Sequence, residues 1–117
     1  MKNNNIFNQT EIPKKIFDDR WVKFAFGPQG TVKSKNLNLG IVSFDENKVS
    51  LTHKHGVEEA LFVLSGKGKI KIGKNIFSIE ENDFVYIPED TNHCIITGPN
   101  SKVRILFIFS GEIIIDN

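Results

Sequence analysis

The sequence predicts an all-β sandwich or barrel, and three observations support this prediction. Short segments alternate apolar and polar side chains with a period of two, as strands with one buried face do. Gly, Asn, Asp or Pro separates each segment from the next, and these residues favour turns. No window of about 11 or more residues shows the 3.6-residue apolar period of an amphipathic helix.

The strand segments follow one another along the chain. An extended entry at 12–17 precedes the first clear strand, and the turn 27–30 ends that strand. The glycines of Ser65-Gly66-Lys67-Gly68 and of 73–75 are typical of hairpin turns. The expected strands are 21–26, 37–44, 49–55, 59–64, 69–72, 76–79, 84–87, 93–96 and 103–109, and the tail 112–115 has the pattern of one more.

Length sets the number of domains. The chain has 117 residues, which is within the usual size of one domain. Neither a repeat nor a linker interrupts the strand pattern. We therefore expect a single domain over residues 1–117, with the polar residues 1–10 as a flexible N-terminal tail.

Composition argues against several classes of partner. Lys+Arg is 15 and Asp+Glu is 14, so a net charge of +1 gives no reason to expect nucleic acid or an anionic membrane as a partner. A single cysteine excludes an internal disulfide framework and a four-thiolate zinc site. No apolar run has the length of a signal peptide or a membrane span. We expect a cytoplasmic protein.

The three histidines form the clearest functional pattern. His53 and His55 are two residues apart in the predicted strand 49–55, so both rings should project from one face, together with Val49 and Leu51. A tight turn would return the carboxylate of Glu59 beside them. His93 opens a later strand, which a closed barrel can place beside the first pair.

These residues lie in a pattern that resembles the first motif of the cupin superfamily. The family pattern is Gly, five residues, His-x-His, three or four residues, Glu, six residues and Gly. Here His53-Lys-His55-Gly-Val-Glu-Glu59, then six residues and Gly66, match it. Asn47 replaces the leading glycine.

The second cupin motif is matched in part. It consists of Gly, five residues, Pro-x-Gly, two residues, His, three residues and Asn. Pro88 and His93 match, whereas Asn82 and Asp90 stand in place of the two glycines and Thr97 in place of the final Asn. Asn and Asp tolerate left-handed backbone angles best after glycine, so we expect these substitutions to preserve the turns.

The resemblance implies a double-stranded β-helix, the jelly-roll barrel, with one divalent transition metal inside it. The implied ligands are His53, His55, Glu59 and His93, and the implied metals are Fe, Mn, Ni or Zn. A metal-dependent enzyme for a small polar metabolite is the leading expectation, of dioxygenase, decarboxylase, isomerase or lyase type. The alternatives are a non-catalytic module for a sugar or small metabolite, and a barrel that keeps the residues without a functional metal.

Other candidate residues are less convincing as site residues. Cys94 follows His93 directly, so alternation should turn it away from the metal and into packing. Glu58 should be exposed. Tyr86 could donate a proton in the pocket, although packing is the simpler role, and Arg104 should point outward rather than anchor a substrate carboxylate.

Apolar residues on both faces of several strands predict a homodimer. In the segments 84–87 and 105–109, odd and even positions are both apolar, so both faces of the strand are apolar. The segments 21–26 and 113–115 add further apolar surface. A strand that is buried on one face only should alternate apolar and polar residues. Strands without this alternation therefore need something to cover their second face. A partner subunit would supply it. The alternative is that the chain around 12–26 folds back over its own barrel.

Overall fold

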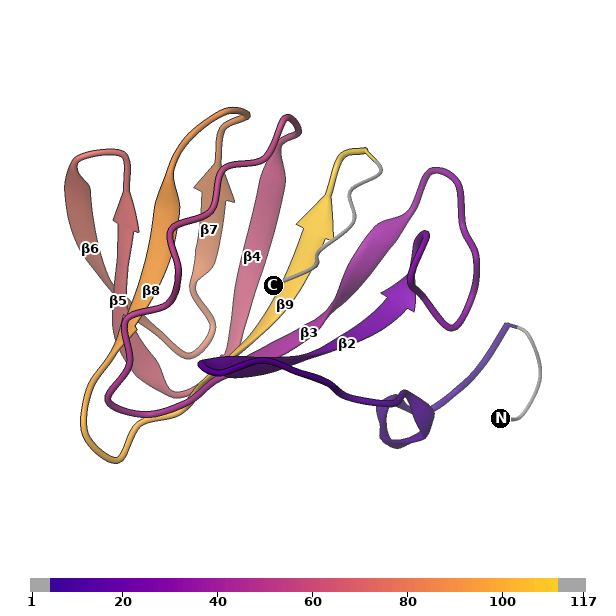
Figure 1. Cartoon of the computed structure of the whole chain (residues 1–117), viewed down its shortest axis with the longest axis horizontal. Helices are drawn as coiled ribbons and strands as arrows, with labels where there is room; N and C mark the ends of the chain where they lie inside the picture. Colours follow the sequence, from indigo (N-terminus) through magenta and orange to yellow (C-terminus); the bar gives the residue numbers. More distant parts are fainter. Residues whose placement is uncertain (1–4, 112–117) are drawn as a thin grey trace.

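The computed structural model describes residues 5–111 as two antiparallel β-sheets that face each other (Figure 1). The larger sheet has the strand order β1-β2-β3-β9-β4-β7 and the smaller one the order β6-β5-β8. The fold is the predicted jelly-roll barrel. Its elements are η1 (Gln9–Glu11), β1 (Lys15–Ile16), β2 (Arg20–Phe26), β3 (Asn38–Phe44), β4 (Glu59–Ser65), β5 (Lys67–Ile72), β6 (Asn75–Glu80), β7 (Phe84–Ile87), β8 (His93–Thr97) and β9 (Val103–Phe109).

Eight of the predicted strands are present, with boundaries that differ by at most two residues. The predicted strand in the tail 112–115 lies outside the described residues. Within residues 5–111, no helix is both long and apolar enough to cross a membrane.

The predicted strand 49–55 is wrong as a continuous strand. The segment runs beside β8, but only Val49 and His53 make isolated bridges to it (Figure 1). The Ser50 hydroxyl accepts the N–H of Ile95 at 2.8 Å, so a side chain takes the place of a backbone carbonyl and breaks the ladder. As a result Ser50 is buried, whereas Val49 and Leu51 are exposed and do not share a face with the histidines.

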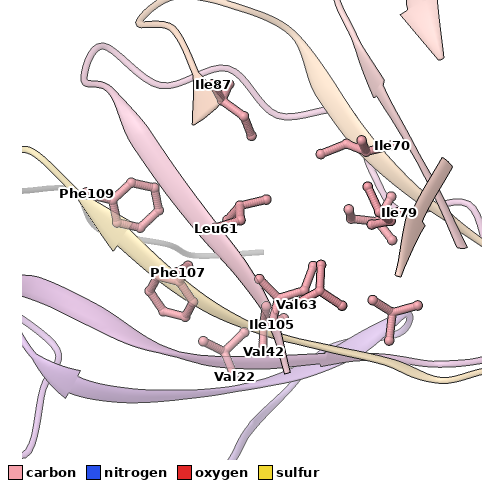
Figure 2. Packing of buried hydrophobic residues seen from close by; sticks show 12 residues of the cluster. Val22, Val42, Leu61, Val63, Ile70, Ile79, Ile87, Ile105, Phe107 and Phe109 are labelled. Atoms are coloured by element: carbon pink, nitrogen blue, oxygen red, sulfur yellow. The ribbon is translucent and has the colours of Figure 1, made fainter. Parts of the chain in front are cut away.

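The core fills the space between the two sheets (Figure 2). Strand β9 shows most clearly how inward-facing residues are buried and outward-facing residues are exposed. Its residues Val103, Ile105, Phe107 and Phe109 are at most 4% exposed, whereas the intervening Arg104 and Ile108 point outward. The inward residues of β9 therefore form the central apolar wall of the barrel.

Turn geometry confirms the expectation for the substituted glycines of the motifs. Asn47, Asn82 and Asp90 have φ values of 55°, 77° and 55°, in the left-handed region. Gly66 has φ 86°, and a Cβ atom there would lie 1.9 Å from the carbonyl oxygen of Lys102. The two motifs thus supply tight turns, by glycine or by its best substitutes.

The N-terminal segment covers part of the outer face of the larger sheet. The Nζ of Lys23 in β2 donates to the carbonyl oxygen and to Oε1 of Gln9, at 2.9 and 2.7 Å. Ile12 is 7% exposed, and Phe7 packs on Phe26 with 5.7 Å between ring centroids. Over β2 and β3, the chain therefore does fold back on its own barrel.

The outer face of β4, β7 and β9 has no such cover from the described residues. Phe84, Tyr86 and Ile108 are 83%, 59% and 42% exposed. Phe84 pairs in register with Phe62 on β4, and their ring centroids are 4.7 Å apart. This surface is called the β7 face below.

Candidate metal site

Backbone pairing brings His53 to His93. Each residue donates its N–H to the carbonyl of the other at 2.9 Å, so the two residues lie directly opposite in the antiparallel bridge. Directly opposite side chains project from the same face. Their ring centroids are 6.3 Å apart.

His55 completes a triad of rings. The carbonyl of His55 accepts the N–H of Asp90 at 2.7 Å, which holds this part of the chain beside the loop before β8. Its ring centroid is 5.9 Å from that of His53 and 5.4 Å from that of His93, and it packs edge-on against Phe109. One nitrogen from each ring lies within 4.8 Å of the other two. Three imidazoles this close suggest metal binding.

Glu59 joins this group from the start of β4. It is paired between Phe109 and Ile87 in the sheet and is 7% exposed, so its carboxylate faces the barrel interior. Oε1 lies 3.2 Å from Nε2 of His93, within the range of an ion pair. The structure thus gathers the three histidines and places the Glu59 carboxylate beside His93, at the edge of that group.

The polar atoms of the group fit a metal ion. Nε2 of His53 is buried and has no hydrogen-bond partner among the described residues, whereas Oε1 of Glu59 is buried with Nε2 of His93 beside it. A buried polar atom without a partner is costly, so such atoms indicate a ligand. Nδ1 of His93 lies 3.0 Å from the carbonyl oxygen of Thr91. Since that oxygen can only accept, Nδ1 donates to it, and Nε2, which lies beside the Glu59 carboxylate, is the nitrogen that a metal ion could bind.

Electrostatics keeps two of the histidines neutral. Burial, and then the positive charge of Arg20, lower the pKa of His53 to about 4. Burial also lowers the pKa of His55, against the opposing effect of Glu59. For His93, burial acts to lower the pKa, but the polar contacts with Glu59 and Thr91 outweigh it and the pKa is raised. A neutral imidazole is the form that binds a metal.

The cluster borders a cavity of about 60 Å³ inside the barrel. Its walls are mostly aliphatic and aromatic, with Val22, Leu61, Ile105 and Phe107 among them. Larger hollows elsewhere lie on the outer surface, away from the histidines. The cavity is therefore a small, largely apolar chamber with polar groups on one side, as ligand sites usually are.

Two polar residues of the cavity wall were not identified from sequence. Arg20 and Ser50 are 4% and 7% exposed and line the cavity beside the histidines. The sequence held one indication for Arg20: it lies two residues before Val22, and residues two apart in a strand share a face. Both line the cavity from the inward face of β2.

The weaker candidates take the following positions. Cys94 is buried, as expected of a packing residue, although it also borders the cavity and is not turned fully away from it. Tyr86 lies on the outer surface, where its hydroxyl donates to the carboxylate of the exposed Glu58. Arg104 points outward as expected, with its guanidinium 5.1 Å from the ring centroid of Trp21.

Known proteins show the same fold. The polyketide cyclase RemF from Streptomyces resistomycificus superposes with a TM-score of 0.78 at 15% identity, over 100% of this chain and 88% of that chain. The DMSP lyase DddQ from Ruegeria pomeroyi has a TM-score of 0.80 at 18% identity, over 92% and 60%. An uncharacterized protein of Streptomyces coelicolor is 24% identical over 79 residues, which are 68% of this chain and 74% of that protein.

The family comparison covers both motifs. The model of the Cupin_2 family, described as the cupin domain, matches residues 40–109, more than half of the chain. This match includes the three histidines and Glu59, and the structural likeness extends the same fold on either side of it. The chain belongs to the cupin domain family.

Proposed function

We propose that this protein binds one divalent transition metal through His53, His55, Glu59 and His93, and acts as a metal-dependent enzyme on a small molecule in the barrel. One observation carries the proposal. Three imidazole nitrogens within 4.8 Å of one another border a buried cavity, Nε2 of His53 has no hydrogen-bond partner among the described residues, and the Glu59 carboxylate lies beside His93. Imidazole and carboxylate together suit Fe, Mn, Ni or Zn.

The chain's own residues would prepare the chemistry. A bound metal supplies Lewis-acid polarisation of a carbonyl or carboxylate oxygen. The Thr91 carbonyl fixes the tautomer of His93, and the aliphatic and aromatic walls keep bulk water from the chamber. The cyclase and the lyase of similar fold support an enzymatic role, of dioxygenase, decarboxylase, isomerase or lyase type. Fold likeness alone does not select among these reactions.

Elemental analysis of purified protein tests the metal. We expect close to one equivalent per chain, and a His55→Ala variant should lose most of it while keeping the far-UV spectrum of a β-protein. Lys54→Ala is the matched control, because Lys54 is the exposed neighbour of His55. Undiminished metal in His55→Ala would refute the site. A metal-loaded protein that holds a sugar or metabolite without turnover would support a binding module instead of an enzyme.

We also propose that the protein forms a homodimer through the β7 face. The exposed Phe84, Tyr86 and Ile108 support this, because contiguous apolar patches are uncommon on monomers. The N-terminal segment already covers the other half of the outer face, so a second copy is needed only over β4, β7 and β9.

A further inference from the structure

The segment that carries the first two histidines contains one more residue than the strand beside it. Val49 bridges to Ile96 and His53 bridges to His93, so the segment advances by four residues while β8 advances by three. An extra residue of this kind is a β-bulge, in which two residues oppose one on the partner strand. Here residues 51–52 take the place that one residue would take in a regular ladder, and they are called the bulge below.

The bulge changes which residues face the barrel. Before it, Ser50 lies opposite Ile95, and both are buried residues of the cavity wall. After it, His53 lies opposite His93, and both again line the cavity. The inward positions of the segment are therefore even-numbered before the bulge and odd-numbered after it. With unbroken alternation His53 would face outward, as Val49 does with an exposed fraction of 68%.

Two side chains bind the backbone groups around the bulge. The Ser50 hydroxyl accepts the N–H of Ile95 at 2.8 Å, where a regular ladder would use the Ser50 carbonyl, and it donates to the Leu51 carbonyl at 3.3 Å. A carboxylate oxygen of Asp19 accepts the N–H of Leu51 at 3.3 Å. A buried N–H needs an acceptor. Without the hydroxyl, the N–H of Ile95 would therefore draw in the carbonyl of residue 50 and favour a regular ladder.

We propose that Ser50 is a positioning residue of the candidate metal site, because its hydroxyl holds the bulge that turns His53 and His55 into the barrel. This inference rests on the proposed function, since it explains how ligands of that same site are directed. A shift of the register by one residue would move both rings to the outer face. The hydroxyl of Ser50 thus determines metal affinity, although Ser50 is not among the proposed ligands.

Titration of the metal-free protein with Zn²⁺ is the first test. Ser50→Ala should weaken zinc binding by roughly 10- to 100-fold, the range for groups that orient metal ligands. Ser50→Thr keeps the hydroxyl and should bind zinc within a few-fold of the wild type. Ser43→Ala is the matched control, because Ser43 is a buried serine of β3 that does not line the cavity. Its zinc affinity should equal that of the wild type, and wild-type affinity in Ser50→Ala would overturn the inference.

Deletion of Thr52 separates positioning from a general loss of stability. It removes the extra residue, so a regular ladder would still place Ser50 opposite Ile95 and His53 opposite His93. The deletion variant should fold and bind zinc within a few-fold of the wild type, and adding Ser50→Ala to it should change the affinity little. A deletion variant without zinc binding, or a large further loss on adding Ser50→Ala, would contradict the inference. This pair decides the question if Ser50→Ala alone does not fold.

Modification of histidines by diethyl pyrocarbonate gives a readout that needs no metal. In chelator-treated Ser50→Ala, His53 and His55 should react several-fold faster than in the wild type, because rings turned outward are more exposed. Ser43→Ala should react like the wild type, and unchanged rates in Ser50→Ala would overturn the inference. If the wild type binds no metal, the proposed function fails, whereas the modification rates still report whether Ser50 directs the histidines.

Discussion

The two faces of β2 show how one strand separates two kinds of chemistry. Arg20 lines a largely apolar chamber, together with the three histidines and Glu59. Lys23 points outward, where it donates to Gln9 and lies 5.4 Å from the ring centroid of Trp21. Both cations are buried, but only the inward one lines the cavity. Burial alone therefore does not distinguish the two charges, whereas the face on which each lies does.

The same contrast extends across the larger sheet. Its inner face is a packed wall, in which Val63, Val103 and Ile105 are fully buried. Its outer face is covered over β2 and β3 and exposed over β4, β7 and β9. The inner face thus carries the core and the candidate metal site, and the outer face leaves apolar side chains exposed over β4, β7 and β9. The predictions below test this division.

The largest expected effect concerns stability. Ile105 and Ile108 lie on opposite faces of β9, with exposed fractions of 0% and 42%. Ile105→Ala should lower the free energy of unfolding by about 2–5 kcal/mol, because it leaves a cavity in the core. Ile108→Ala should cost less than about 1 kcal/mol. Urea unfolding of the two variants measures the difference, and equal losses would contradict the division of the faces.

An intermediate effect concerns assembly. Light scattering at micromolar concentration should give twice the chain mass of 13.3 kDa for the wild type. Phe84→Glu should shift the mass to that of a monomer, because it introduces a charge at the centre of an apolar contact. Metal content should not change, since the β7 face and the cavity are separate surfaces. A wild-type mass near 13.3 kDa would refute the dimer.

The smallest expected effect concerns pH. Free histidine titrates near ~6.5, and the pKa of His53 in the fold is about 4. Between these values the unfolded chain binds a proton that the native state does not, so stability falls as the pH is lowered from 7 to 5. His93, whose pKa is raised, contributes with the opposite sign.

A His53→Gln variant isolates this contribution, because the effect of His93 is common to both proteins. In chelator-treated protein, the wild type should lose about 1 kcal/mol more than the variant between pH 7 and pH 5, after allowance for solvent screening of a half-buried ring. Parallel pH profiles would show that His53 titrates normally in the folded protein.

Local alternation in the sequence predicted the all-β fold class, and the resemblance to the cupin motifs supplied the jelly-roll barrel and the proposed ligands. The alternation of apolar and polar residues predicted β9, and the spacing of the motif residues singled out His53, His55 and His93. The left-handed angles at Asn47 and Asn82 followed from residue chemistry.

Features that depend on long-range contacts could not be predicted. Arg20 directly precedes the predicted strand 21–26 and looks like an exposed polar residue there, whereas the fold buries it in the cavity wall beside Asp19 and joins Asp19 to the backbone of Leu51. The break in the segment 49–55 likewise depends on Ser50 reaching Ile95, 45 residues away. In both cases a side chain binds a backbone N–H of a distant segment, which alternation does not show.

Anomalous diffraction from crystals of the metal-loaded protein tests the central claim most directly. We predict one strong peak inside the barrel, at roughly 2.0–2.3 Å from one nitrogen each of His53, His55 and His93. A carboxylate oxygen of Glu59 should complete the set. A peak on the outer surface, or none inside the barrel at full metal loading, would contradict the account.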